Sequence, residues 1–315
     1  MSVGTRTRTL LKTTTPTRRL DVAASYEALT QACAATADDA RQAELVSDSP
    51  NHLWSLPVGM FAMVHPDLDE AWAVIKGALY LREQRVPAIA PWYHDVRAGT
   101  EGRAVTFWPD PGKTSADTSL SAWVTALTHR IDPASAPWLR EHDTFAGLLD
   151  GLDDAPLNAA ARRFLREHTA QLHEEWDYLE WPTPDAVVLG AHGMIPIHDG
   201  GVHVGLLLRR PLTRGHREWD LVAARWRSEL LIGPREDHRT YAGTYLSYQR
   251  EDQVPDYPYI GAWSGYQVVR DVVALTAAMG AVRRAHLDKR IRQEAEHRVA
   301  CLRGAYPAPW NWGLR

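Results

Sequence analysis

The chain has 315 residues, a formal net charge of −4, and 45% hydrophobic and 23% charged residues. These are ordinary values for a globular protein, and the weak negative charge excludes nucleic acid and anionic membrane as partners bound by bulk charge attraction. No stretch approaches eighteen apolar residues, so the sequence contains no predicted membrane span. We therefore expect a cytoplasmic protein without a nucleic-acid or membrane partner.

Residues 1–20 are rich in threonine and arginine and contain no acidic residue. They lack the continuous apolar segment of a secretory signal, so we expect a flexible N-terminal tail. The chain has only four lysines against an abundance of arginines, which is typical of a GC-rich bacterial genome.

The first part of the chain combines short strands with helices. Apolar residues at helical spacing predict helices over 21–42 and 69–83, and β-rich composition predicts strands over 52–56, 60–65 and 103–109. The segment between the second helix and the last strand contains two prolines and is predicted to be extended. This part should form a small β-rich unit.

After Gly112 the sequence is dominated by helical patterns. The predicted helices span 119–131, 140–152, 157–179, 219–231, 237–249, 269–287 and 289–304. Two short apolar strands interrupt them, at 185–193 and 202–210, and we expect these two strands to pair as a β-hairpin.

Six segments, taken in this order, resemble the aminoglycoside phosphotransferase and choline kinase superfamily over roughly residues 25–315. They read REQRVPAIAP, GRAVTFWPD, ALTHRI, LGAHGMIPIHDG, HVGLLLRRPLTRGHREWDL, and EAEHRVACLRG followed by PWNW. The resemblance implies an α+β, two-lobed, protein-kinase-like fold with a small β-rich N-lobe and a larger helical C-lobe. We expect the tail at 1–20, the N-lobe at 21–108, the hinge at 109–113 and the C-lobe at 114–315.

The resemblance also assigns the positions that carry phosphoryl transfer. They are a strand lysine, a helical glutamate that pairs with it, a catalytic aspartate and a metal-binding aspartate. In this chain these positions hold Met63, Val74, Met194 and Leu208. A shifted alignment does not restore the lysine, because residues 42–75 contain no lysine or arginine. Glu70, one helical turn before Val74, is therefore expected to have nothing to pair with.

Asp199 falls where the resemblance places a metal-binding asparagine, and two interpretations stay open. Its carboxylate is a suitable Mg²⁺ ligand, but Asp-Gly-Gly is also typical of a turn. His198 and Asp199 together are candidate catalytic residues, as a His–Asp general base for a non-phosphoryl reaction. We predict no metal site. Two other positions, His192 and Asp220, match the family, which implies that Asp220 ties the catalytic turn to the helix below it.

Trp108, Arg209 and Arg210 are candidate ligand-binding residues. Trp108 would either pack in the core or stack on a flat ring. The two arginines lie in a segment, 200–217, that contains no acidic residue. This segment is interpreted as a solvated loop, as an anion site that replaces the metal, or as a docking surface for an acidic peptide.

The loss of four functional positions on an intact frame favours a pseudokinase that acts as a binding or scaffold component in a bacterial biosynthetic pathway. One alternative is recruitment of the fold to non-phosphoryl chemistry on a small-molecule or peptide substrate. Another is a divergent, active, ATP-dependent kinase. No cofactor is expected, since only the active-kinase alternative requires ATP and Mg²⁺. The expected partners are a small-molecule or peptide ligand in the interlobe cleft and a protein partner.

Overall fold

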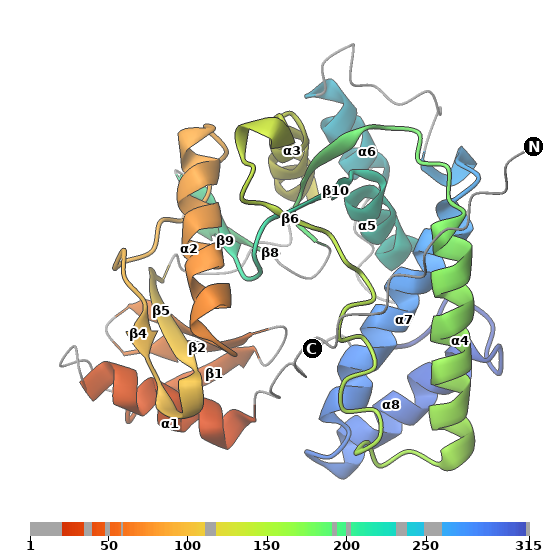
Figure 1. Ribbon diagram of the computed structural model, residues 1–315, viewed down its shortest axis with the longest axis horizontal. Helices are drawn as coiled ribbons and strands as arrows, with labels where there is room; N and C mark the ends of the chain where they lie inside the picture. The colour runs from red at the N-terminus through yellow and green to blue at the C-terminus, as the bar shows by residue number, and fades with distance from the viewer. Residues whose placement is uncertain are drawn as a thin grey trace, which may run out of the picture.

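The computed structural model describes residues 21–34, 40–47, 51–57, 59–110, 118–190, 194–199, 203–230, 238–248 and 260–312. The predicted tail at 1–20 lies outside these ranges. Strands of the N-terminal part gather on one side of the molecule and helices of the C-terminal part on the other (Figure 1). Within the described ranges, no helix combines the length and the apolar composition needed to cross a membrane.

A five-stranded sheet of order β1-β2-β3-β5-β4 forms the centre of the N-lobe. Its strands are β1 (Glu44–Ser47), β2 (His52–Leu56), β3 (Met60–His65), β4 (Arg97–Ala98) and β5 (Ala104–Pro109), with antiparallel neighbours throughout. The turn between β2 and β3 contains Gly59 at a φ of +72°, a conformation that glycine adopts without steric cost. The three predicted strands are confirmed. The edge strand β1 was not predicted, because its exposed residues show no apolar pattern.

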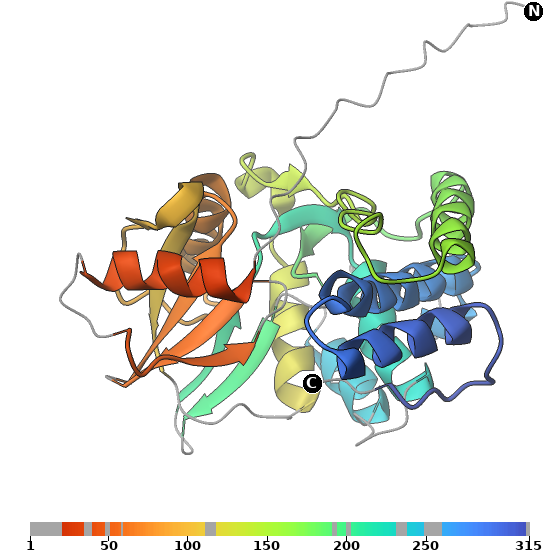
Figure 2. The ribbon, with the colours of Figure 1, turned by 90° about the horizontal axis from the view of Figure 1, so that it is seen from below.

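A helix covers each face of this sheet, so that β3 is buried on both sides. Successive residues of a strand point to opposite faces. Ala62 and Val64 pack in one cluster with α1 (Val22–Ala34), whereas Met63 packs in another cluster with α2 (Leu68–Glu83). Figure 2 shows α1 lying across the sheet. The predicted helix at 69–83 is confirmed as α2, while the helix predicted over 21–42 ends at Ala34.

The described part of the C-lobe contains six α-helices. They are α3 (Thr118–His129), α4 (Ala159–Asp177), α5 (Glu218–Leu230), α6 (His238–Ser247), α7 (Tyr266–Arg284) and α8 (Lys289–Leu302). The apolar side chains of α7 pack against α4, α5 and α8 in one large cluster (Figure 1). The expected lobe boundaries remain a prediction, because residues 111–117 lie outside the described ranges.

Two predictions for the C-lobe are wrong. Residues 140–152 are not helical, since β6 (Arg140–Glu141) is followed by turns in which Gly147 and Gly151 have φ of +63° and +73°. In addition, β9 (His203–Leu208) pairs with β8 (Met194–Asp199), whereas β7 (Asp185–Val188) pairs with β10 (Thr213–His216). We had not predicted β8 because Pro196 interrupts it, and proline lacks the N–H that a strand donates.

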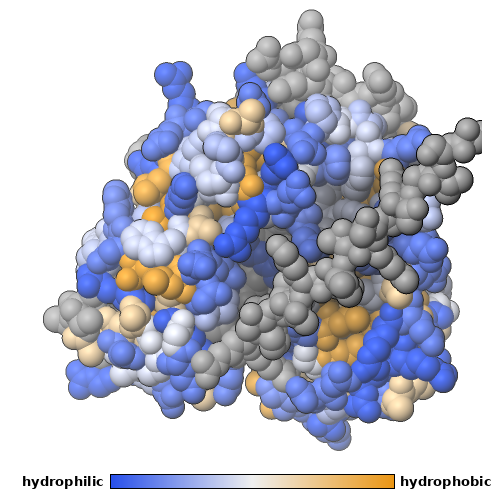
Figure 3. Space-filling view, in the orientation of Figure 1, coloured by the Kyte–Doolittle hydropathy of each residue, from blue (hydrophilic) through white to orange (hydrophobic). Residues whose placement is uncertain are grey.

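Hydrophilic residues cover most of the face shown in Figure 3, and its apolar areas lie apart on the two lobes. Large apolar side chains that remain exposed include Trp72 and Trp92 in the N-lobe and Tyr178 in the C-lobe. Scattered exposure of this kind is normal for a folded protein and needs no partner to explain it.

The two lobes meet where α2 lies beside β9 (Figure 1). At Gly77 of α2, an added Cβ would lie 2.8 Å from Leu208 Cδ2 and 3.2 Å from Leu212 Cγ, so only glycine fits this approach. The backbone of β9 also pairs with the N-lobe, since Ile89 N–H donates to Leu206 O at 2.9 Å and Leu206 N–H donates to Pro87 O at 3.0 Å. Apolar residues of both lobes consequently form one buried cluster.

We predict that Gly77→Ala destabilises the protein by about 1–3 kcal/mol, because the added methyl group overpacks the junction between α2 and β9. Gly280→Ala is the matched control: Gly280 also lies inside a helix, and an added Cβ there meets nothing within 4 Å. It should stabilise by about 0.5–1 kcal/mol through helix propensity. Urea denaturation measures both, and equal stabilisation by the two variants would contradict the close approach.

Candidate functional site

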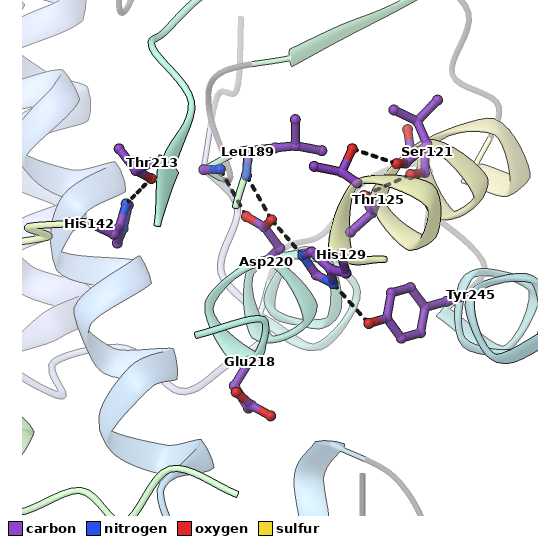
Figure 4. A network of polar contacts seen from close by, with 12 residues as sticks. Ser121, Thr125, His129, His142, Leu189, Thr213, Glu218, Asp220 and Tyr245 are labelled. Atoms are coloured by element: carbon purple, nitrogen blue, oxygen red, sulfur yellow. Dashed lines mark hydrogen bonds and ion pairs between the residues drawn. The ribbon is translucent and has the colours of Figure 1, made fainter. Parts of the chain in front are cut away.

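Asp220, in the first turn of α5, lies at the centre of a network of hydrogen bonds. Its carboxylate accepts hydrogen bonds from the backbone N–H groups of Leu189 and Gly190, both at 2.9 Å (Figure 4). It also lies 3.0 Å from His129 Nε2, and His129 Nδ1 lies 2.8 Å from the Tyr245 hydroxyl. Asp220 therefore ties the segment before the catalytic turn to α5 and α3, as the resemblance implied. His192 lies outside the described residues.

The histidine tautomer follows from these partners. A carboxylate accepts, so His129 Nε2 carries the proton that Asp220 binds, and Nδ1 accepts from the hydroxyl of Tyr245. All three side chains are buried. This chain of hydrogen bonds thus holds the ends of α3, α5 and α6 together and is positioned to support structure rather than to contact a substrate.

The positions of the lysine, its glutamate partner and the metal-binding aspartate are closed to solvent. Met63, Val74 and Leu208 are each 0% exposed, and all three belong to the buried cluster that joins the lobes. A thioether and two aliphatic groups neither grip phosphate nor bind Mg²⁺. In this chain these positions contribute apolar packing, and methionine suits irregular gaps of this kind.

The strand register separates the remaining family positions. Met194 and Leu208 are paired Cα to Cα across the β8–β9 hairpin, whereas Asp199 is paired with His203 at the other end. Five residues of strand place Asp199 about 17 Å from Met194. Asp199 is therefore not brought to the position where the two aspartates of the family would meet.

His198 lies next to Asp199 on β8 and is paired with Val204. The side chains of His198 and Asp199 are outside the described part of the structure, so their catalytic role stays a prediction. Among the described residues, no three His, Cys, Asp or Glu side chains are placed to hold a metal ion.

Arg209 directly follows β9 and reaches across to the N-lobe. Its guanidinium donates to the backbone oxygen of Asn51 at 2.5 Å and to Ser47 Oγ at 3.0 Å. Asn51 Nδ2 donates in return to the backbone oxygen of Arg209 at 2.8 Å. Ser47 is the last residue of β1, and Asn51 directly precedes β2. Arg209 is only 5% exposed, so an anion could bind it only by displacing these protein contacts.

The prediction that Glu70 has nothing to pair with is wrong. Its Oε1 accepts from Asn51 Nδ2 at 2.9 Å. Burial raises the pKa of the Glu70 carboxyl above its usual value, and the Asn51 hydrogen bond and the positive charge of Arg210 oppose that increase. The side chain of Arg210 is exposed. Glu70 thus interacts with an amide and with the charge of an arginine, both from segments outside its own helix.

A second set of polar groups lies beside this network on the face of the sheet that α2 covers. His65 Nδ1 lies 3.2 Å from Asn51 Nδ2, and His65 Nε2 lies 2.9 Å from Thr106 Oγ1. The two hydrogens of this amide nitrogen point to the closer Glu70 Oε1 and Arg209 O, and the nitrogen cannot accept a proton from Nδ1, which favours a neutral ring with its proton on Nε2. Burial and the nearby charge of Arg209 lower the pKa of His65 to about 3. The geometry and the pKa both require a neutral ring.

Trp108 is fully buried, and its Nε1 donates to Thr106 Oγ1 at 2.8 Å. It belongs to the same apolar cluster as Met63. Of the two interpretations given above, core packing is the one observed. Stacking on a ligand stays a prediction that would require this cluster to open.

Sequence reasoning missed Asn51, His65 and Thr106. Asn51 directly precedes a predicted strand and Thr106 lies inside one, so neither position indicates a functional site by itself. The available signal was His65, a titratable residue at the end of a strand that is otherwise apolar. Such a residue needs a buried partner, but the sequence does not say which segment supplies it.

We predict that the neutral, buried His65 makes the protein acid-sensitive. Its folded-state pKa lies below the usual value of 6.5, so the unfolded state binds more protons as the pH falls. This contribution to stability is complete above pH 6.5 and declines by up to about 1.4 kcal/mol per pH unit between pH 6.5 and about 3. Urea denaturation at pH 7.5, 6.0 and 4.5 should show a steeper loss for the wild type than for His65→Gln. Equal slopes would rule out this origin of acid sensitivity.

No family model matches the chain, and no curated protein matches it by sequence. Solved structures match over most of its length. Amicoumacin kinase, in complex with AMP-PNP, Ca²⁺ and Ami, is 11% identical with a TM-score of 0.57 over 87% of this chain and 92% of that one. A choline/ethanolamine kinase family protein from Mesorhizobium loti is 12% identical with a TM-score of 0.53 over 85% of this chain and 88% of that one.

A thermostable mutant of an aminoglycoside phosphotransferase is 10% identical with a TM-score of 0.51 over 85% of this chain and 96% of that one. At such identities the likeness shows the fold and says nothing of activity. The expected fold class is confirmed: the chain shares with these structures an α+β, two-lobed, protein-kinase-like fold.

Proposed function

We propose that this protein is a pseudokinase of the aminoglycoside phosphotransferase type that acts as a binding or scaffold component. The observation that carries the proposal is the buried cluster at Met63, Val74 and Leu208, which fills positions where the family places charged groups. The frame around Asp220 is kept because it supports the fold without taking part in phosphoryl transfer.

The chemistry of phosphoryl transfer supports this proposal. Catalysis rests on positioning and on electrostatic stabilisation by a cation on the nucleotide phosphates and by carboxylates that hold Mg²⁺. Apolar side chains supply none of these charges. Amicoumacin kinase was solved with AMP-PNP and Ca²⁺, whereas in this chain Arg209 binds backbone and hydroxyl groups of its own N-lobe.

We predict that millimolar ATP, with or without Mg²⁺, does not raise the melting temperature of the purified protein. A ligand at about 100 times its dissociation constant would stabilise by about 2.7 kcal/mol, which thermal denaturation detects easily. Amicoumacin kinase is a suitable positive control for the assay.

The other possible results separate the alternatives. A shift that requires Mg²⁺, together with ATP hydrolysis abolished by Asp199→Ala, would establish an active kinase and overturn the proposal. Loss of cellular function in His198→Ala at unchanged stability, without any ATP effect, would instead indicate non-phosphoryl chemistry.

We also predict that Met63→Lys, which restores the family residue, destabilises the protein by at least about 3 kcal/mol, because it places an unpaired charge in a closed apolar cluster. Met63→Leu is the matched control and should cost less than about 1.5 kcal/mol, since it conserves volume and polarity. Urea denaturation measures both variants. If Met63→Lys were as stable as Met63→Leu, the position would be open to solvent or anions, contrary to the filled site proposed here.

A further inference from the structure

Asn51 and Arg209, which are 158 residues apart in the sequence, bind each other reciprocally. The side chain of Asn51 donates to the backbone of Arg209, and the side chain of Arg209 donates to the backbone of Asn51. Both residues are buried. Each lobe thus contributes one donor and one acceptor to the same contact. The two lobes are therefore joined by a pair of buried hydrogen bonds, which differs from a single hydrogen bond on the surface.

The contact is anchored on both sides. In the N-lobe, Asn51 Nδ2 also reaches Glu70 on α2 at 2.9 Å and His65 on β3 at 3.2 Å. In the C-lobe, Arg209 continues directly from β9, whose Leu208 is packed in the shared cluster. The contact therefore connects the start of β2, α2 and β3 to the end of β9, the strand at which the two lobes meet.

A second line of pairing lies nearby at the same junction. Ile89 N–H and Leu206 N–H form backbone hydrogen bonds between the segment after α2 and β9. Gly205 makes this approach possible, since an added Cβ would lie 2.9 Å from Ile89 Cγ1. Separation of the lobes would break these bonds and expose the apolar cluster between them, which is unfavourable in water.

We propose that Asn51 and Arg209 form an interlobe clasp that holds the N-lobe and the C-lobe in one closed arrangement. The clasp lies at the edge of the shared apolar cluster, next to the start of β2. With this contact in place, the lobes do not open and close around a ligand, which is compatible with the binding or scaffold role proposed above.

Amide hydrogen exchange of the full chain tests the clasp, because Ile89 and Leu206 report on the junction itself. Asn51→Ala and Arg209→Ala each remove one half of the reciprocal contact and leave the other half in place. Each should speed the exchange of these two amides by at least about two- to tenfold, because each removes one side-chain hydrogen bond between the lobes in addition to other contacts of the same side chain. The double variant should exceed either single variant.

Amides within one lobe are the internal reference. Trp92 N–H donates to Phe107 O in the N-lobe and His142 N–H donates to Arg214 O in the C-lobe, both at 2.7 Å. Their exchange should stay unchanged in the clasp variants. Asp288→Ala, which removes the N-cap of α8, corrects for a general loss of stability, since it should not change the ratio of junction to reference exchange.

Junction amides that exchange no faster than the reference amides in both single variants would overturn the clasp. Arg209→Lys is a second variant that keeps the charge but loses the planar guanidinium. Its junction amides should exchange at a rate between those of the wild type and Arg209→Ala. The result does not depend on ATP. Failure of the clasp and failure of the pseudokinase proposal are therefore observed separately.

Discussion

The apolar packing of β3 and α2 against β9 joins the two lobes of this protein, and the other features of the site follow from it. Met63, Val74 and Leu208 lie in this packing without solvent exposure. A charged group could not occupy such a place without a partner, because transfer of an unpaired charge from water to a low-dielectric interior is very costly. Because these positions are apolar, the two lobes share a core there. Phosphoryl transfer requires a hydrated, charged site instead.

Two kinds of carboxylate explain why part of the family pattern is present and part is absent. Asp220 satisfies two backbone N–H groups and a histidine, so its removal would leave buried donors without acceptors. A metal-binding aspartate satisfies an ion, and without the ion it would add only an uncompensated charge. The first kind therefore has a structural role in the fold itself, whereas the second kind has a role only where an ion binds.

The charged residues near the lobe junction form hydrogen bonds with other residues of the protein. Arg209 donates to the backbone oxygen of Asn51, and Glu70 accepts from the side chain of Asn51. His65 fits this network only as a neutral ring. Asn51 and Arg209 form hydrogen bonds between the lobes, whereas His65 and the Trp108 indole both contact Thr106 within the N-lobe.

The sequence by itself determined the fold class, most of the helices and the apolar character of Met63, Val74 and Leu208, because periodicity and side-chain chemistry are local properties. It misjudged residues 140–152, where two glycines with positive φ favour turns, and the partner of β9, which depends on how distant strands meet. Only the tertiary structure decided which partners the charged residues near these positions bind. The contact between Asn51 and Arg209 depends on a turn in one lobe meeting the end of a strand in the other, and local pattern does not encode the packing that brings those segments together.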